Sequence, residues 1–367
     1  MTAETDRRFM EAAIRLSRRN LGLTATNPSV GTLIVSDGAI VGRGVTAIGG
    51  RPHAEPQALA EAGDLARGAT AYVTLEPCAH HGRTPPCAEA LVAAGVARVV
   101  GAASDPDPRV SGRGYAILRD AGIEVVEGVL ANEAADLLAG YLTRARLKRP
   151  EVTLKLAVSS DGMIGRRGAG QVAITGAISR AQVHLMRAES DVIAIGIGTA
   201  LADDPELTCR LPGLEARSPA RLVLDAQLRL PPASKLAVSA RHVPLLLASS
   251  FAAQEARRAA LAGLGAGFLS AELHDGRIAL PELLEVLAAR GFLTLMVEGG
   301  AETAANFLAE GLVDRIALFT GPDAIGAGPD TIGVASPLTA ALGPAGFALV
   351  RQARFGDDLY HEYKRLG

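Results

Sequence analysis

Three side chains with metal-binding chemistry stand out in the first half of the sequence. His53 lies in the run Pro-His-Ala-Glu, Cys78 ends the run Thr-Leu-Glu-Pro-Cys, and Cys87 ends Pro-Pro-Cys. One imidazole and two thiolates form a borderline-soft donor set that suits Zn²⁺. Three protein ligands leave a fourth position open, which is typical of a catalytic zinc site. A helix expected to begin at Cys87 would favour its thiolate form.

Glu55 follows His53 by two residues, in the same expected first helical turn, and is not needed as a ligand. A carboxylate beside an open zinc position can take a proton from water and pass it to a leaving amine. The pattern His-x-Glu followed by Pro-Cys-x-x-Cys is typical of zinc nucleobase deaminases, although Cys78 and Cys87 are nine positions apart here. The alternative is a surface helix start and two buried thiols, and the combination of all these features favours the catalytic site.

The polar segment 79–86 separates the two cysteines and is expected to lie over the zinc site. Arg83 can hold a phosphate through its planar guanidinium group. His80 and His81 can donate to a substrate carbonyl or phosphate, and a solvated loop is the alternative interpretation. His80 as a fourth zinc ligand is disfavoured because it would close the site.

Two glycine-containing turns and one lysine are the chemical signals of the second half. Gly299 and Gly300 stand between an expected strand and a helix, where backbone N–H groups can approach an anion, although a tight turn is the alternative. Another strand ends in Gly-Ile-Gly-Thr at 196–199 and leads into an acidic turn, which could also be a capped helix start. Lys155 lies inside an apolar strand and needs a partner there, unless the strand is at an edge. The G-x-G-x-x-G fingerprint of a Rossmann domain is missing from both turns.

Alternating strand and helix patterns arrange these residues in two successive α/β series. In the first series, strands are expected at 30–35, 40–45, 71–75, 98–102 and 123–126, with helices at 6–19, 55–62, 88–94 and 114–121. Asn132 is expected to cap a further helix that reaches about residue 146. The basic stretch 143–151, which contains Pro150, is predicted to link a domain at 1–147 to a domain at 151–367.

The second series has the same alternating pattern. Strands are expected at 152–158, 192–197, 221–224, 243–248, 293–297 and 315–319, and helices at 179–188, 281–289 and 303–310. The glycine-containing stretch 325–335 is interpreted as a loop.

Composition restricts the class of protein. With 367 residues, of which 49% are hydrophobic and 21% charged, a globular protein of two or three domains is expected. A net charge of -2 and an aromatic content of 4% argue against a nucleic-acid-binding surface. Three Cys argue against a disulfide-stapled secreted domain, and no signal peptide or membrane-spanning run is recognised. A cytoplasmic location is therefore expected.

The runs 27–31, 52–55 and 74–87 together resemble the bifunctional deaminase/reductase family of riboflavin biosynthesis, and the resemblance covers essentially the whole chain. It implies an α/β protein with an N-terminal cytidine-deaminase-like α/β/α domain and a C-terminal dihydrofolate-reductase-like α/β domain. It also implies that His53, Cys78 and Cys87 bind zinc and that Glu55 is the catalytic proton shuttle. Asn27 and the loop 80–83, with His80 and Arg83, would contact the substrate. Without the resemblance, Asn27 is equally well interpreted as a turn residue.

The runs 154–162, 201–208 and 297–300 resemble the reductase domain of the same family, which implies NADPH as the second cofactor. The residues that the resemblance places beside NADPH are Val158, Ala173, Thr199, Asp203, Gly300, Ala301, Glu302, Thr303, Ala304, Ala305 and Asn306. Those that it places beside the substrate are Lys155, Gln171, Arg187, Leu207, Arg210 and Glu298. The family often has Trp where this chain has Ala173, which puts one stacking contact to the cofactor in question. The 2′-phosphate of NADPH needs a basic contact that the sequence does not identify.

These signals predict two successive reactions on one phosphoribosyl pyrimidine. The first is zinc-dependent hydrolytic deamination of diaminohydroxyphosphoribosylaminopyrimidine, and the second is NADPH-dependent reduction of the ribosyl chain of 5-amino-6-(5-phosphoribosylamino)uracil to a ribityl chain. The expected partners are this small molecule and further copies of the chain, as a dimer or tetramer, with no nucleic acid and no membrane.

The sequence disfavours two rival functions. A nucleoside or tRNA deaminase with an accessory domain is disfavoured by the near-neutral charge and by the insertion before Pro-Pro-Cys. A zinc-containing module that only senses a nucleotide is disfavoured by Glu55, because a structural zinc site does not use an acid beside an open position.

Overall fold

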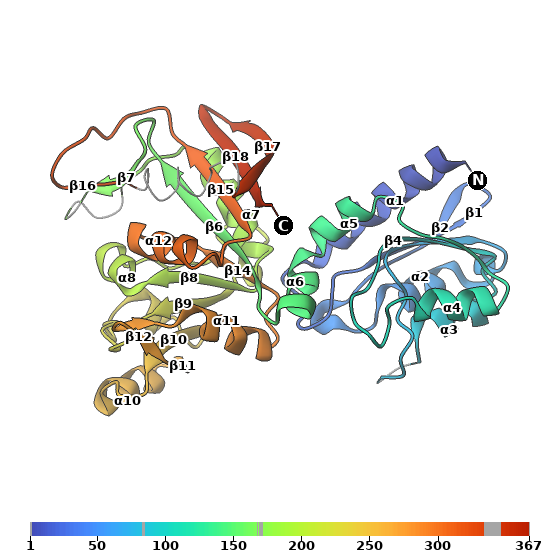
Figure 1. The fold of residues 1–367 in the computed structure, drawn as a ribbon, viewed down its shortest axis with the longest axis horizontal. Helices are drawn as coiled ribbons and strands as arrows, with labels where there is room; N and C mark the ends of the chain where they lie inside the picture. Colours follow the sequence, from blue (N-terminus) through green and yellow to red (C-terminus); the bar gives the residue numbers. More distant parts are fainter. Residues whose placement is uncertain (1, 83–84, 167, 169–171, 334–345, 367) are drawn as a thin grey trace. The chain divides into compact units, whose positions relative to one another are not determined.

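Two units, Met1–Arg149 and Pro150–Gly367, each contain a mixed β-sheet of their own (Figure 1). The computed structural model describes residues 2–82, 85–166, 168, 172–333 and 346–366. Within these ranges, the helices are too short or too polar to cross a membrane.

The sheet of the first unit has five strands in the order β2-β1-β3-β4-β5. The strands are Ala39–Val45 (β2), Gly31–Ser36 (β1), Thr70–Leu75 (β3), Arg98–Ala103 (β4) and Glu124–Val126 (β5). β1 pairs antiparallel with β2 and β3, whereas β3, β4 and β5 run parallel. β3 is buried along its whole length, as expected for a central strand covered on both faces.

Helices cover both faces of this sheet. The helices are Ala3–Ser17 (α1), Ala54–Ala62 (α2), Cys87–Ala94 (α3), Arg113–Asp120 (α4), Ala131–Leu137 (α5) and Ala139–Leu147 (α6). α1, α5 and α6 share a core cluster with Leu33 and Val35 of β1. α3 and α4 share another with Ile34, which points to the opposite face because side chains alternate along a strand. The predicted α/β/α class of the first domain is confirmed.

The helix predicted from Asn132 to about residue 146 is in fact two helices. α5 begins at Ala131 after Leu130, which has the left-handed conformation (φ 56°, ψ 39°), so Asn132 is not the N-cap. The helical path breaks at Leu138 (φ -90°, ψ 9°). The prediction was wrong because Leu130 and Leu138 are buried in the core of the unit, and this tertiary packing outweighs the local capping preference.

The sheet of the second unit has nine strands in the order β11-β10-β9-β8-β14-β6-β15-β18-β17. The strands are Gly267–Ala271 (β11), Leu245–Ser250 (β10), Ala220–Leu224 (β9), Val192–Gly196 (β8), Thr294–Val297 (β14), Glu151–Val158 (β6), Arg315–Thr320 (β15), Asp358–Arg365 (β18) and Phe347–Phe355 (β17). The strands from β11 to β15 in this order run parallel to one another. β18 runs antiparallel to both of its neighbours, β15 and β17. The predicted α/β class is therefore confirmed for this unit too.

The longer helices of this unit connect the parallel strands. They are Ala177–Ala188 (α7), Ile197–Asp203 (α8), Glu255–Gly263 (α10), Leu280–Ala289 (α11) and Ala301–Ala309 (α12). The main core cluster joins one face of the central strands to α11 and α12 through Leu284 and Phe307. The C-terminal ends of β8, β9 and β14 lie at the same edge of the sheet because these strands are parallel.

Part of the stretch predicted as a loop at 325–335 forms a strand. Thr331–Gly333 (β16) pairs antiparallel with Met163–Arg166 (β7), and residues 334–335 lie outside the described residues. The hairpin of β17 and β18 was not predicted from the sequence. Most of β17 is exposed, so it lacks the apolar alternation that identifies a half-buried strand.

Candidate functional site

His53 is held at the start of helix α2 by close packing of this helix on strand β2. It is the N-cap residue of α2 and has extended backbone angles (φ -66°, ψ 170°). Gly44 permits the close approach, because a Cβ there would lie 1.9 Å from the carbonyl oxygen of Ala54. The first turn of α2, which carries His53 and Glu55, is thereby fixed against the sheet.

Cys78 and Cys87 face each other across the connection between β3 and α3. Cys78 follows β3, and Cys87 is the first residue of α3. The backbone N–H of Cys87 donates to Cys78 Sγ over 3.2 Å, and that of Ala88 donates to the Cys78 carbonyl oxygen over 3.2 Å. An N–H group at a helix N-terminus therefore points at the sulfur of Cys78, which favours a thiolate.

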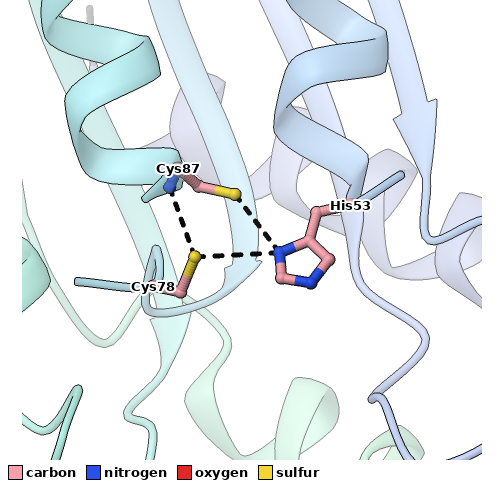
Figure 2. A group of neighbouring side chains, drawn as sticks. All are labelled: His53, Cys78 and Cys87. Carbon is pink, nitrogen blue, oxygen red and sulfur yellow. Dashed lines mark hydrogen bonds between the residues drawn. The ribbon is translucent and has the colours of Figure 1, made fainter. Parts of the chain in front are cut away.

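The three donor atoms point toward one another (Figure 2). His53 Nδ1 lies 3.7 Å from Cys78 Sγ and 3.4 Å from Cys87 Sγ, and the three atoms all lie within 4.8 Å of one another. A tetrahedral zinc ion, with bonds of about 2.3 Å to sulfur and about 2.0 Å to nitrogen, separates such ligand atoms by roughly 3.5–3.8 Å. The donor set and its spacing fit zinc.

Hydrogen bonds among His53, Cys78 and Cys87 determine which of these side chains hold protons. The hydrogen bond with Cys87 lowers the pKa of Cys78 to about 4, and the hydrogen bond with His53 acts in the same direction. The same contacts with Cys78 raise the pKa of Cys87 and of His53. Cys78 is therefore a thiolate that accepts from both neighbours. A metal cation competes with these protons for the same donor atoms.

Glu55 brings a carboxyl group to the three ligands. It is buried, with 4% of its surface exposed, and its side chain hydrogen-bonds with that of Cys87. Burial raises the pKa of Glu55, and the negative charge of Cys78 adds to the effect. A carboxyl group in such an environment exchanges protons closer to neutral pH than an exposed one.

Two acidic residues that the sequence analysis did not select complete the polar surroundings. Glu76, at the end of β3, accepts from the backbone N–H groups of Gly112 and Gly114, both over 3.1 Å. Asp105 accepts from the Tyr141 hydroxyl over 2.9 Å. Burial raises the pKa of Asp105, and the charge of Cys78 contributes. Glu76 could have been found in the run before Cys78, whereas Asp105 and Tyr141 come from distant elements and have no local signal.

The other predicted contacts of the first unit are Asn27, His80 and Arg83. The Asn27 amide packs on Gly50, three residues before His53, where an added Cβ would lie 2.2 Å from Asn27 Nδ2. His80 is half-buried, and its Nδ1 has no hydrogen-bond partner among the described residues. Arg83 lies outside the described residues.

A cleft of about 1450 Å³ lies in the second unit. Its walls include the ends of β8, β9 and β14, the turns that follow them, and parts of β6 and α7. Ligands of open α/β sheets bind at this edge, where parallel strands end. The volume exceeds the roughly 300–1,000 Å³ of a typical small-molecule site, so the cleft has room for a cofactor and a substrate together.

Most of the predicted reductase residues line this cleft. The lining residues predicted to contact the substrate are Lys155, Arg187, Leu207, Arg210 and Glu298, and those predicted to contact NADPH are Ala173, Thr199, Asp203, Gly300, Ala301, Glu302, Thr303 and Asn306. Val158 and Ala304 are instead buried in the core, and Ala305 is half-buried outside the lining. Gln171 lies outside the described residues.

A buried ion pair forms one wall of the cleft. Arg187 Nε and Nη2 donate to the two carboxylate oxygens of Glu298, each over 2.7 Å, and these side chains are only 11% and 6% exposed. Burial favours the neutral form of Glu298, but the charge and hydrogen bonds of Arg187 outweigh it and lower the pKa of this carboxyl group. Burial lowers the pKa of Lys155, against the attraction of Glu298. Lys155 and Arg187 thus place two cations beside one carboxylate.

His184 is a cleft residue that the sequence analysis did not select. It lies on α7, one turn before Arg187, and its Nδ1 is 3.2 Å from the Thr208 carbonyl oxygen and 3.3 Å from the Arg210 backbone nitrogen. Burial lowers the pKa of His184, and the charge of Arg187 adds to the effect. The ring supports the segment that carries Leu207 and Arg210. Its spacing of three residues from Arg187 on one helix was the available signal.

The turns after β8 and β14 pack tightly together in the middle of the cleft. Gly300 has a φ of 70°, and a Cβ there would lie 2.8 Å from Thr199 Oγ1. Gly300 is also the N-cap of α12, so the N–H groups of the first turn of this helix are at the cleft. A glycine turn that leads into a helix is suited to bind a phosphate group.

Family models match both units. Residues 150–358 match the RibD C-terminal domain, and residues 3–103 match the cytidine and deoxycytidylate deaminase zinc-binding region. The second match includes the three candidate zinc ligands and Glu55.

Relatives of known name match nearly the whole chain. The riboflavin biosynthesis protein RibD of Aquifex aeolicus is 38% identical over 89% of this chain and 90% of its own length. RibD of Acinetobacter baumannii has a similar structure, with a TM-score of 0.86, 35% identity and 100% of each chain covered. The diaminohydroxyphosphoribosylaminopyrimidine deaminase/5-amino-6-(5-phosphoribosylamino)uracil reductase of Thermotoga maritima has a TM-score of 0.86, 32% identity and 99% of each chain covered.

Proposed function

This chain belongs to the RibD family of riboflavin-biosynthesis proteins, and from this premise we infer how its two units divide the chemistry. The chain is a bifunctional enzyme, a deaminase and a reductase, and its cofactors are zinc and NADPH. We propose that the deaminase domain spans 1–147 and the reductase domain 151–367. The division of the chain after Arg149 supports these boundaries.

In the first unit, the proposed substrate is diaminohydroxyphosphoribosylaminopyrimidine. His53, Cys78 and Cys87 would hold zinc, which when bound supplies a Lewis acid that activates water. Glu55 accepts a proton from the attacking water and delivers it to the amine that leaves the ring. The buried position of Glu55 supports this role, because its raised pKa eases the return of the proton. Asn27, His80 and Arg83 are proposed to bind the substrate around this centre.

In the second unit, the proposed substrate is the deaminated product, 5-amino-6-(5-phosphoribosylamino)uracil. NADPH when bound supplies a hydride for the ring-opened ribosyl chain. Lys155, Arg187 and Arg210 surround the phosphate-bearing substrate with positive charge. Glu298 orients the Arg187 guanidinium through two hydrogen bonds and keeps the two neighbouring cations together. Gln171 and Leu207 are the remaining proposed substrate contacts.

The convergence of one imidazole nitrogen, two sulfurs and a buried carboxyl group is the observation that supports the deaminase proposal most directly. The test supplies the first substrate with and without NADPH and follows ammonia release and NADPH oxidation. Ammonia should appear without NADPH, and NADPH should be oxidised only as the deaminated product forms. Oxidation of NADPH without prior ammonia release would contradict the proposed order.

Glu55→Gln is the variant that isolates the proton transfer. It should keep zinc but release ammonia about 10²–10⁴-fold more slowly, which is the usual contribution of a general acid–base group. Reduction of the directly supplied intermediate is the internal control and should be unchanged. Near-normal ammonia release by zinc-loaded Glu55→Gln protein would remove Glu55 from the mechanism.

We also propose a homo-oligomer, a dimer or tetramer, in the cytoplasm. The family relationship supports the oligomer, and the three free cysteines suit a reducing compartment. Light scattering coupled to size-exclusion chromatography measures the mass directly. A monomer at micromolar concentration would contradict the proposed assembly.

A further inference from the structure

Four arginines that line the reductase cleft have no role in the proposed substrate chemistry. Arg166 and Arg180 already donate to backbone carbonyl oxygens, which leaves Arg229 and Arg277. Arg229 follows β9, and Arg277 belongs to the small hairpin of Leu273–His274 (β12) and Arg277–Ile278 (β13). Both line the cleft and both are exposed, Arg277 with 65% of its side chain. Neither residue was predicted from the sequence.

These arginines lie far from the substrate end of the same cleft. Arg229 follows β9, whereas Lys155 is in β6, and the sheet order is β9-β8-β14-β6. Adjacent strands are about 4.8 Å apart, so three intervals separate these strands by roughly 14 Å. The glycine turns after β8 and β14, which are suited to phosphates, lie between them. A dinucleotide with its nicotinamide beside the substrate and its pyrophosphate on these turns therefore places its adenosine near β9.

The two arginines lie around the end of β9. Ile278, adjacent to Arg277, packs in the same core cluster as Leu224 and Ala226 at this strand end. Arg277 Nη2 is 3.6 Å from Glu302 Oε1, and both side chains are exposed, so the pair is weak. Arg229 makes no hydrogen bond or ion pair within the described part of the chain, so its guanidinium is free to bind an anion.

The acidic residue at this strand end does not line the cleft. Enzymes that use NAD often place a carboxylate here to bind the ribose 2′-hydroxyl, whereas a nearby arginine accommodates the 2′-phosphate of NADP. Asp225 directly follows β9 but is fully buried, and its Oδ2 accepts from the Leu230 backbone N–H over 2.8 Å. It organises the turn 225–230 that presents Arg229. Apart from the exposed Glu302, which forms the weak pair with Arg277, the charged groups at this end of the cleft are therefore the two arginines.

We propose that Arg229 and Arg277 bind the 2′-phosphate of NADPH and make the reductase select NADPH over NADH. The inference rests on the proposed reductase function and adds the residues that determine its cofactor specificity. Guanidinium groups bind phosphate through paired charge-assisted hydrogen bonds, which neutral side chains cannot replace.

The test measures dinucleotide binding to the full-length protein without substrate, by calorimetry with NADPH and with NADH. Arg229→Gln and Arg277→Gln should each raise the Kd for NADPH about tenfold or more, the usual effect of losing a hydrogen bond between charged groups. The Kd for NADH should stay within about twofold. In the double variant the preference for NADPH should nearly disappear.

Arg257→Gln is the matched control. Arg257 is exposed and donates to the Gln227 carbonyl oxygen over 3.4 Å, close to the same turn, but it does not line the cleft. Its removal changes the net charge equally and should leave both Kd values unchanged. A double variant that keeps the wild-type preference, or that weakens NADPH and NADH equally, would overturn the specificity role alone. A wild-type protein that binds neither dinucleotide would overturn the reductase assignment as well.

Discussion

Replacement of Glu298 by glutamine should destabilise the second unit through the cations it leaves behind. The pair with Arg187 has two bonds of 2.7 Å and is largely buried, and Lys155 adds a second nearby cation. Breaking a buried pair by removing one partner costs about 3–5 kcal/mol. Arg187 keeps its bond to the Thr208 carbonyl oxygen at 3.0 Å, and the cleft admits water, so the lower end, about 3 kcal/mol, is expected. For a unit of roughly 200 residues this lowers the melting temperature by about 6–12 °C.

Differential scanning calorimetry of the full chain should show this loss in one transition while the zinc-containing unit melts as before. Glu206→Gln is the matched control, because Glu206 pairs with Arg210 at 3.1 Å but both side chains are about half exposed. Exposed pairs typically contribute about 0.2–1 kcal/mol, which shifts the melting temperature by at most about 4 °C. A loss in Glu298→Gln no larger than that in Glu206→Gln would refute the reasoning.

The same pair predicts a pH dependence. Arg187 holds the folded-state pKa of Glu298 below the ordinary value of 4.5 against the opposing effect of burial. A carboxyl group with a depressed pKa stabilises the fold above the unfolded-state pKa, and this stabilisation is lost as the pH falls through the folded-state pKa. The difference in stability between wild type and Glu298→Gln should therefore be constant between pH 6 and 8 and shrink only below about pH 4.5.

Three further outcomes test the remaining assignments. Cys78→Ser should lose both zinc, measured by metal analysis, and ammonia release. Cys209→Ser, which changes a buried thiol outside the metal group, should keep both. A zinc-free but fully active Cys78→Ser protein would contradict the site. Lys155→Ala should severely weaken reduction of the supplied deaminated intermediate, with zinc content and ammonia release unchanged, because the cleft loses a cation facing an anionic substrate. Reduction within about twofold of wild type would remove Lys155 from substrate binding. A fragment ending at Arg149 should bind zinc and release ammonia, because the chain divides there; a soluble, zinc-loaded but inactive fragment would contradict independent function.

The sequence predicted the elements whose apolar pattern is regular and whose ends carry local signals. β1 and β2 with their turn, and α3 with Gly95 after it, were predicted within a residue or two. The ends of α5 and α6 were not, because the burial of Leu130 and Leu138 decides them. The exposed β17 gave no pattern to detect.

The same distinction applies to the two sites. His53, Glu55, Cys78 and Cys87 stand in short motifs, so their proximity could be anticipated before the fold was known. Asp105 and Tyr141 meet only through tertiary structure, from β4 and α6 regions that are separate in sequence. Arg229 and Arg277 likewise come to one cleft only through the strand order of the sheet.

The position of β14 in its sheet has a consequence for synthesis of the chain. β14 lies between β8 and β6, although it is made long after both, so Glu298 cannot reach Arg187 until this late strand is inserted. Ribosomes add roughly 5–20 residues per second, and the stretch from Arg149 to Glu298 therefore takes roughly 7–30 s to make. During that interval the first unit is complete and can take up zinc, while β6 and β8 expose unpaired apolar edges. Translation that stops shortly before β14 should thus leave a folded deaminase attached to an aggregation-prone tail.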